Sequence, residues 1–411
     1  MMKRTDTIII GAGQCGLAMS QELTLSGVDH VILERGQAGN SWRTERWDSL
    51  RLLTPNWMNR LPGVKAGFED GDIFMLASDF AQRFNQCARV NNAPLCSETT
   101  VLSVGGTPEN YRVQTDQGVM ECRNIVMANG ACAKSRIPVF GNDIPPGIQS
   151  FTPLTYKHPD QLPQGRVLVV GASASGLQIA REIGKAGHDV TLAVGNHVRV
   201  PRTYRGADIF NWLDVTGVMT TPHTEVDDIE RVRRTPSLSL MGGQNIDLNS
   251  LQDDGVEITG RLAGISDGRA IFSGSLANHC ASADLKMKRL FRKIDDWIAE
   301  NGISDLIPVA APFEATRIPL LPRLSIDLSG EGFSTIIWAT GFRPDFSWLN
   351  LPVFDRKGRL MQDGGGVGHG LYVMGLPYLR QRKSTFIDGA SEDAEALAAH
   401  LVAGFGRTLA A

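Results

Sequence analysis

The sequence predicts an α/β protein in which one strand–turn–helix–strand unit occurs twice, the second copy inserted into the domain that the first begins. Residues 5–33 contain an apolar strand, a glycine-rich turn, a segment of helical periodicity and a second apolar strand. Residues 165–194 repeat that order. Apolar strands return near residues 335 and 371, so the two ends of the chain are expected to share one sheet. This pattern favours two Rossmann-like dinucleotide-binding domains.

Length and composition exclude several classes of function. The chain has 411 residues, enough for two buried cores, and its net charge of −3 gives no basic excess that would hold a nucleic acid. No apolar run is long enough to span a membrane, and no signal peptide precedes the first strand. The six cysteines form no CxxC pair and show no metal-ligand spacing. We therefore expect a cytoplasmic protein with reduced thiols, without a structural metal or a redox dithiol.

The first unit carries a complete nucleotide-binding pattern. Gly11, Gly13 and Gly16 form GxGxxG between a strand and a helix. The first glycine permits a tight turn, the second lets a pyrophosphate approach the backbone, and the third lets helix and strand pack closely. Glu34 ends the next strand, 23 residues after Gly11, where a carboxylate can accept the ribose hydroxyls. Because strand, turn, helix and acid coincide, a ligand-free glycine turn explains them less well.

Segments rich in proline and glycine suggest the domain boundaries. The expected domains are residues 1–160, 161–325 and 326–411, of which the first and last together form one dinucleotide-binding unit and the middle one forms the other. Within the first part we expect a loop at 36–75, a helix at 77–89, short strands at 99–104, 111–115, 119–122 and 124–128, and a proline-rich connector at 133–165. A mixed segment fills the middle domain to residue 325, and an amphipathic helix at 392–409 ends the chain.

The second unit differs from the first in its charges. Gly171, Ser173 and Gly176 repeat the turn as GxSxxG, but Val194 stands where the first unit has its glutamate. Arg199 and Arg202 follow in the next loop. An absent carboxylate together with nearby arginines favours binding of a 2′-phosphate, and therefore NADPH over NADH. The alternative is an ordinary solvated basic loop.

These motifs resemble the flavin-containing monooxygenases, in particular their short bacterial relatives and the plant indole-3-pyruvate monooxygenases. The resemblance covers nearly the whole chain and includes "GAGQCGLAMS", "LERGQAGNSWR", "VLVVGASASGLQIA", "IIWATGFRPDFSWL" and "FIDGASEDAEALAAHL". It implies FAD contacts at Gly11, Gly13, Gln14, Cys15, Gly16, Glu34, Arg35, Trp42, Leu50 and Gly341. It implies NADPH contacts at Gly171, Ser173, Gly176, Arg199 and Arg202. For Trp42, a plain role as a core aromatic residue is an equal alternative.

The resemblance also implies a reaction. NADPH would reduce FAD, the reduced flavin would bind dioxygen as a peroxide adduct, and one oxygen atom would pass to a small organic substrate. Asn56 is the polar residue expected near the flavin, with a turn-forming asparagine after Pro55 as the alternative. The chain departs from the family fingerprint at Thr152, where a histidine is expected, with Tyr156 as the aromatic residue that follows.

Two other functions stay open at this stage. One is an NAD(P)H-dependent flavoprotein reductase or oxidase that passes electrons to a quinone, a protein or oxygen. The other is a redox-sensing protein that binds both nucleotides without turnover. A homodimer is compatible with the sequence, which does not identify the substrate.

Overall fold

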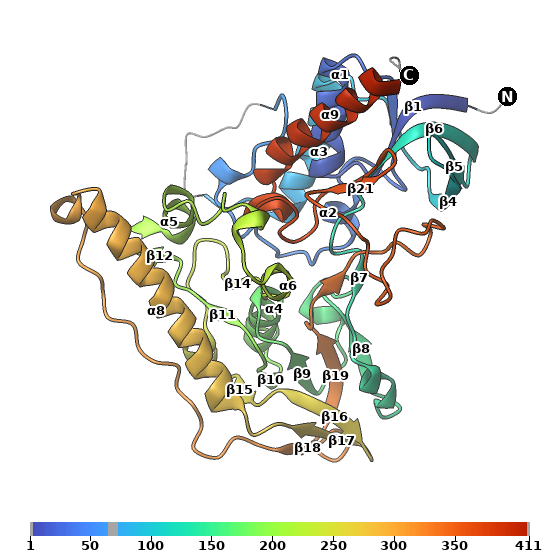
Figure 1. Cartoon of the computed structure of the whole chain (residues 1–411). Helices are drawn as coiled ribbons and strands as arrows, with labels where there is room; N and C mark the ends of the chain where they lie inside the picture. Colours follow the sequence, from blue (N-terminus) through green and yellow to red (C-terminus); the bar gives the residue numbers. More distant parts are fainter. Residues whose placement is uncertain (1–2, 65–72, 409–411) are drawn as a thin grey trace.

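Two separate sheets organise the protein, whose computed structural model describes residues 3–64 and 73–408 (Figure 1). The first sheet has the order β21–β22–β6–β1–β2–β3, and β5 and β4 extend it as an antiparallel meander from β6. Its strands are β1 (Lys3–Ile10), β2 (His30–Leu33), β3 (Leu95–Cys96), β4 (Val101–Thr107), β5 (Asn110–Thr115), β6 (Gly118–Met127), β21 (Gly366–Gly368) and β22 (Leu371–Val373). Since β22 pairs with β6, the two ends of the chain share this sheet, as expected from the sequence.

The central strand β1 is buried on both faces. Ile9 packs under the helices α1 (Gln14–Leu25), α3 (Ala77–Val90) and α9 (Gly389–Thr408), and α1 lies beside α9 (Figure 1). Ile8 and Ile10 point to the opposite face, where they join Tyr111 of the meander. Alternate side chains of one strand therefore serve two cores, as the period of two in a β-strand requires.

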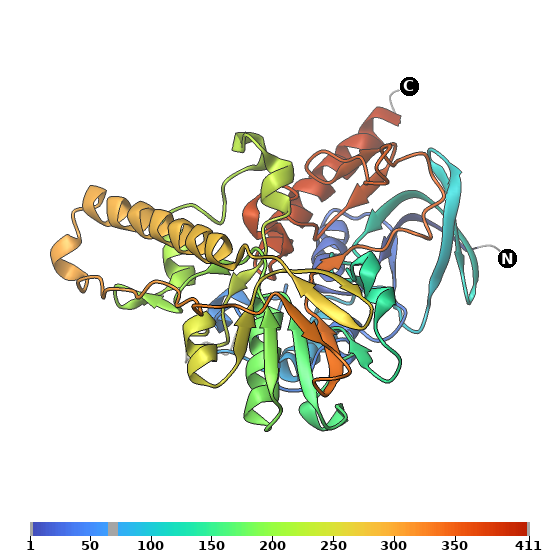
Figure 2. The same ribbon diagram turned by 90° about the horizontal axis from the view of Figure 1, so that it is seen from below.

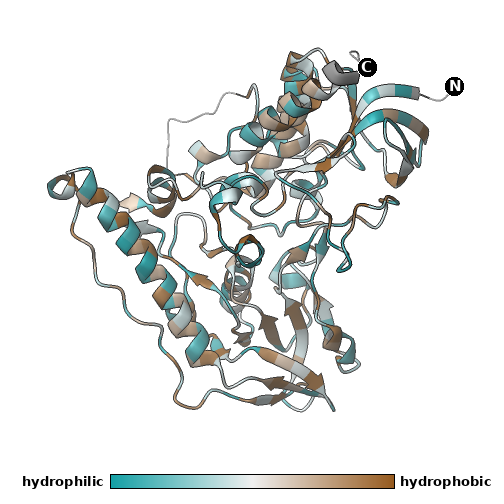
Figure 3. Ribbon diagram, viewed as in Figure 1, coloured by the Kyte–Doolittle hydropathy of each residue, from teal (hydrophilic) through white to brown (hydrophobic). Residues whose placement is uncertain are grey.

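The second sheet has the order β15–β10–β9–β19–β8 and is wholly parallel. Its strands are β8 (Gln149–Phe151), β9 (Arg166–Val170), β10 (Val190–Ala193), β15 (Glu257–Thr259) and β19 (Phe333–Trp338), and β9 and β19 are brown in the hydropathy view (Figure 3). One face packs against α4 (Ala174–Lys185) and α7 (Leu248–Asp253). The other is covered by the meander of β16 (Leu262–Ser266), β17 (Arg269–Phe272) and β18 (Ser325–Asp327).

The remaining elements are mostly short and connect these layers. The exception is α8 (Leu276–Glu300), a helix of 25 residues at one end of the molecule (Figure 2). The others are α2 (Asn40–Thr44), β7 (Lys134–Ser135), β11 (Val198–Arg199), β12 (Thr203–Tyr204), β13 (Ala207–Asp208), α5 (Ile209–Val215), α6 (Ile229–Arg233), β14 (Leu238–Ser239), β20 (Phe342–Arg343), and the 3-10 turns Asn56–Met58, Val139–Asp143, Pro159–Gln161, His223–Glu225, Ser304–Leu306 and Arg382–Thr385.

Strand pairing places the insertion at residues 149–338, which differs from the expected limits of 161 and 325. Strands β8 and β19 both belong to the second sheet, although the sequence analysis assigned them to the first domain. The two strands expected at 119–122 and 124–128 are one continuous strand, β6. Helix α8 was not anticipated, although its buried side chains repeat every three or four residues from Leu276 to Ile298.

The chain crosses between the two sheets at two adjacent places. Strand β7 leaves the first sheet and β20 returns toward it, and the two pair antiparallel through Ser135 with Phe342 and Lys134 with Arg343. The second sheet is thus attached to the first by two hydrogen-bonded segments that lie side by side.

Candidate active site

The first glycine turn is closely packed at Gly11 and Gly16 and open at Gly13. Gly11 has φ +106°, and a Cβ on it would lie 2.7 Å from the backbone oxygen of Ala128. A Cβ on Gly16 would lie 1.9 Å from the oxygen of Gly11, so helix and strand touch there without room for a side chain. By contrast, a Cβ on Gly13 would meet no described atom within 4 Å. Gly13 therefore borders open space at the N-terminus of α1, where free N–H groups can bind an anion.

The backbone of the second turn closely resembles that of the first in its dihedral angles and in its close contacts. Gly171 has φ +111°, and its Cβ would lie 2.3 Å from the oxygen of Ala339, the counterpart of Ala128. A Cβ on Gly176 would lie 1.8 Å from the oxygen of Gly171. Ser173 precedes α4 with φ −88° and ψ −178°, close to the values of −81° and −169° at Gly13 before α1. The expectation of two equivalent phosphate-binding turns therefore agrees with the backbone geometry.

One cavity of about 250 Å³ lies between the two units. Gln14, the first residue of α1, lines it from one side, and Ala174, the first residue of α4, lines it from the other. The rest of its wall comes from Trp42, Arg46, Trp47, Leu50, Arg51, Leu52, Leu53, Thr54, Cys132, Pro153, Ser175, Gln178, Ser237, Phe342, Thr385, Phe386 and Ile387. The N-termini of both turn helices thus face a single, mainly apolar space.

Comparisons with known proteins agree with this duplicated architecture. A family model described as pyridine nucleotide-disulphide oxidoreductase matches residues 8–213. An uncharacterized CzcO-like oxidoreductase of Geobacillus kaustophilus is 30% identical over 407 residues, which cover 97% of this chain and 98% of that protein. The chain belongs to the pyridine nucleotide-disulphide oxidoreductase family.

Within this oxidoreductase family, the chain is similar to flavin monooxygenases. A rice indole-3-pyruvate monooxygenase, YUCCA1, is 30% identical over 235 residues, which cover 51% of this chain and 54% of the plant protein. The structure of a flavin-containing monooxygenase from Stenotrophomonas maltophilia superposes with a TM-score of 0.68 at 18% identity, covering 98% of this chain and 99% of that one. The expected resemblance and the expected fold are both confirmed.

Glu34 contacts the first glycine turn, whereas Arg35 forms an ion pair at the surface. The buried carboxylate of Glu34 accepts hydrogen bonds from the backbone N–H groups of Ala12, at 2.8 Å, and Gly36, at 3.2 Å. Glu34 therefore lies directly beside the turn, as the expected ribose contact requires. Arg35 is more than half exposed and forms an ion pair with Glu45.

The expected flavin contacts Gln14, Trp42 and Leu50 all line the cavity, whereas Cys15 is buried and is not part of the lining. Trp42 meets Phe80 edge to face at 5.2 Å, so it belongs to the core and to the cavity at once. Burial, with a smaller contribution from the Asp393 carboxylate, raises the pKa of the Cys15 thiol to about 12. Cys15 is therefore a packing residue rather than a reactive thiolate.

Of the remaining expected contacts in the first unit, Asn56 lies outside the cavity wall and Gly341 lies at the crossing between the two units. Asn56 is buried, its Oδ1 has no hydrogen-bond partner among the described residues, and it is not part of the cavity wall, which Thr54 reaches instead. Gly341 has φ +94° and accepts a hydrogen bond from the N–H of Arg136 at 2.9 Å. It follows β19 of the second sheet, at the crossing between the two units.

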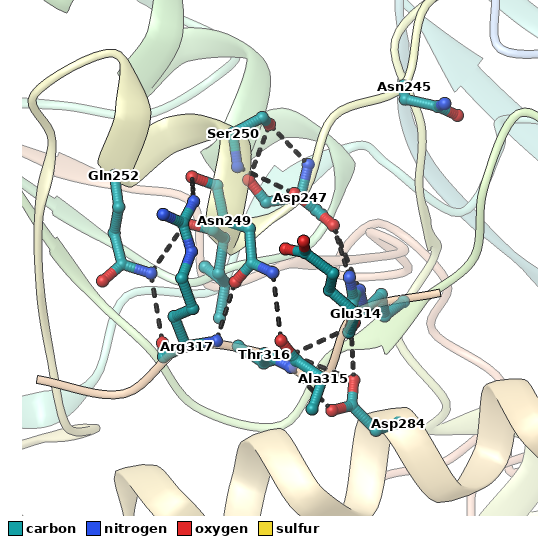
Figure 4. Close-up of polar contacts among 12 residues, drawn as sticks. Asn245, Asp247, Asn249, Ser250, Gln252, Asp284, Glu314, Ala315, Thr316 and Arg317 are labelled. Carbon is teal, nitrogen blue, oxygen red and sulfur yellow. Dashed lines mark hydrogen bonds and ion pairs between the residues drawn. The ribbon is translucent and has the colours of Figure 1, made fainter. Parts of the chain in front are cut away.

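Arg199 is a buried structural residue in this structure. Its guanidinium donates to the carboxylates of Asp247, at 2.7 Å, and Asp284, at 2.8 Å, and to the backbone oxygen of Glu314, at 2.8 Å. Figure 4 shows the surrounding polar network. Two carboxylates already neutralise this arginine, so the structure does not present it to a 2′-phosphate.

Arg202 is similarly engaged. It forms a bidentate pair with Asp208, at 2.6 and 2.7 Å, and its side chain is only 3% exposed. It also donates to the backbone oxygens of Leu53, at 2.7 Å, and Gly242, at 2.9 Å. These contacts cannot be read from the sequence, because no motif around Asp208 or Leu53 indicates them.

Another arginine lies just beyond strand β10, the strand that corresponds to β2 of the first unit. Parallel strands β10 and β15 finish side by side, and the stem of Arg261, just after β15, passes over Gly195, just after β10. There the Nδ1 of His279 lies 3.0 Å from Oδ1 of Asn196. Burial, followed by the charge of Arg261, lowers the pKa of His279. Strand adjacency was the missing information, because Arg261 is 67 residues beyond Val194 in the sequence.

Two further features bear on the chemistry. Among the residues that the structure describes, no group of His, Cys, Asp and Glu side chains could hold a metal ion, and no helix is long and apolar enough to cross a membrane. Thr152 is buried, and its N–H donates to the hydroxyl of Thr155 at 2.9 Å, while Tyr156 donates to Glu182 at 2.9 Å. The segment after β8 is therefore a closed local turn beside the cavity residue Pro153.

Proposed function

We propose that this oxidoreductase is an FAD-dependent, NADPH-using monooxygenase that acts on a small organic substrate in the cavity between its two units. The observation that carries the proposal is the convergence of both glycine-turn helices on one cavity, with Gln14 on one wall and Ala174 on the other. Two dinucleotides bound at these N-termini would direct their far ends into the same space. Electron transfer between them requires such proximity.

The residues present fit both nucleotides. The open space at Gly13 and the carboxylate beside the turn suit FAD in the first unit. Ser173 and the equivalent backbone suit the pyrophosphate of a nicotinamide dinucleotide in the inserted unit, residues 149–338. Relatives named as flavin monooxygenases support the same assignment.

Bound FAD would supply hydride acceptance and the activation of dioxygen, which protein side chains cannot provide. The protein's own contribution is to hold both rings and to exclude water. Trp42, Trp47, Phe342 and Phe386 give the cavity wall its apolar character. An apolar wall favours transfer of oxygen to the substrate over its loss as hydrogen peroxide.

The preference for NADPH over NADH is best supported by Arg261 and His279. Val194, which is fully buried, stands directly after β10 where the first unit has Glu34. The second unit therefore has no carboxylate at this position to repel a 2′-phosphate. Arg261 supplies a cation at the end of the neighbouring strand. These residues replace Arg199 and Arg202 in the proposal, because carboxylates already neutralise those two arginines.

The deciding experiment is a coupling measurement on the purified chain. The amounts of NADPH consumed, hydrogen peroxide released and oxygenated product formed are determined with amines, thioethers, indoles and 2-oxo acids. A monooxygenase yields product in proportion to NADPH with at least one of these classes. If every class gives one peroxide per NADPH and no product, the protein is instead an oxidase or reductase.

A further inference from the structure

The segment of residues 301–324, here called the strap, exposes an unusual number of apolar side chains. It returns from the end of α8 to β18 and runs alongside that helix in both views (Figures 1 and 2). Of the 18 large apolar side chains that are exposed in the described part of the chain, seven lie on the strap: Leu306, Val309, Phe313, Ile318, Leu320, Leu321 and Leu324. Leu320 and Leu321 are 99% and 91% exposed. Such a concentration is typical of an interaction surface.

The strap is fixed in place mainly by its backbone, although one of these side chains, Phe313, packs against Phe291 of α8 at 5.2 Å between ring centroids. The oxygen of Glu314 accepts from the buried Arg199, and the oxygen of Ala315 accepts from Nδ2 of Asn249 at 3.0 Å. The N–H of Thr316 donates to Asp284 of α8 at 2.9 Å (Figure 4). Farther along, the oxygen of Arg323 accepts from Thr259 at 2.5 Å. A buried network thus anchors the strap while its leucines face outward.

Helix α8, which forms the edge together with the strap, segregates its charges along its length. Lys286, Lys288, Arg289, Arg292 and Lys293 are exposed, and no acidic residue occurs between positions 285 and 293. The next stretch, from 294 to 305, is acidic: Asp296, Glu300 and Asp305 are exposed, and no basic residue occurs there. In Figure 3 the visible face of α8 is mostly hydrophilic. The edge therefore has a basic half followed by an acidic half.

We propose that this edge is the interface of a homodimer in which α8 and the strap of one copy lie antiparallel to those of a second copy. A two-fold axis near residue 294 would place the basic half of each helix opposite the acidic half of its partner. The same rotation would bring the exposed side chains of the two straps together. An anionic lipid surface fits less well, because it would repel the acidic half that adjoins Leu306.

The first test measures the mass of the purified full chain in solution by light scattering and sedimentation at micromolar concentration. We expect a dimer. The double change Leu320→Asp and Leu321→Asp should weaken it on the order of a hundredfold or more, because each leucine loses its apolar burial and a charge is desolvated. Val139→Asp is the matched control, since Val139 is 88% exposed but lies in a different part of the chain. This control should leave the dimer intact.

The second test examines the antiparallel arrangement through charge exchange. Lys288→Glu with Arg289→Glu reverses two charges of the basic half, and Asp296→Lys with Glu300→Lys reverses two charges of the acidic half. Each variant alone should be monomeric, and an equimolar mixture should form a heterodimer. A monomeric unmodified chain would overturn the proposal, whether or not it sediments with phosphatidylglycerol vesicles. So would a dimer insensitive to both sets of changes. Neither outcome depends on catalysis, so the result is independent of the proposed function.

Discussion

The guanidinium of Arg202 donates to the backbone oxygen of Leu53 at 2.7 Å, joining two residues that are 149 positions apart. Leu53 lines the cavity, and Arg202 belongs to the inserted unit. The rings of Phe74 and Phe210 lie 4.4 and 5.3 Å from the same guanidinium. One buried side chain therefore fixes a wall of the cavity against the second unit.

Arg202→Met should destabilise the protein by about 3–5 kcal/mol, because it leaves the Asp208 carboxylate buried without a counter-charge. Thermal unfolding monitored by circular dichroism measures this loss. Arg112→Ala is the control, since its ion pair with Glu121 spans 4.0 Å at the surface and its removal should leave the melting temperature unchanged. A substitution at Arg202 that altered only the Michaelis constant for NADPH would contradict the structural role.

Arg261→Ala should raise the Michaelis constant for NADPH by roughly tenfold to a hundredfold, since one charged contact to a phosphate contributes about 1.5–3 kcal/mol. The constant for NADH should change little, because NADH has no 2′-phosphate. Steady-state oxidation of both nucleotides provides the comparison. Arg269→Ala, which changes an exposed side chain of β17, serves as the matched control. Equal effects on the two nucleotides would rule out the assignment of Arg261.

Two glycines of the first turn should respond differently to substitution. Gly13→Val places its side chain in open space, so the chain should fold normally but purify without FAD. Gly16→Ala instead forces a Cβ against the Gly11 oxygen and should cost about 1–3 kcal/mol or more in folding stability. Absorbance of bound flavin and thermal melting distinguish the two effects. A Gly13→Val protein that retains one FAD per chain would refute the placement.

Asp393 should make stability depend on pH. Burial raises the pKa of this carboxyl to about 6 in the folded protein, from 3.8 for the free group. The folded chain therefore holds a proton that the unfolded chain releases between about pH 4 and 6, and stability falls as pH rises through that window. The full difference corresponds to about 3 kcal/mol.

Asp393→Asn should abolish most of this fall, as urea unfolding at pH 4 and pH 7 would show. The control is Asp160→Asn, whose side chain is 94% exposed. A variant whose stability still declined as steeply as that of the unmodified protein would assign the pH dependence to other groups.

The sequence predicted where the helices and strands lie better than it predicted which strands pair with one another. Strand β1, helix α1 and the two glycine turns follow from periodicity and from the special geometry that only glycine permits at Gly11 and Gly171. Strands β19 and β22 are both short apolar runs, buried on both faces, and such runs carry no information about which sheet they join. For that reason the expected limit at residue 325 did not anticipate that the second sheet extends to residue 338.

The candidate site shows the same division. Residues attached directly to a turn, such as Gln14 and Glu34, could be located from the motif. Arg199 was expected to contact a 2′-phosphate, because its actual partners, Asp247 and Asp284, lie 48 and 85 positions away and carry no signal in the sequence. Long-range carboxylates decide whether an arginine is available to a ligand, and the sequence does not reveal them.

The insertion of the second sheet has a consequence for the order in which the chain can fold during its synthesis. All five strands of that sheet lie within residues 149–338. They have therefore been synthesised before β22, which completes the first sheet, and before α9, which covers that sheet. Until residue 371 leaves the ribosome, β6 has a vacant edge, and α1 lacks the neighbour against which it packs. The inserted unit can therefore form first, and the N-terminal segment must wait for the last part of the chain.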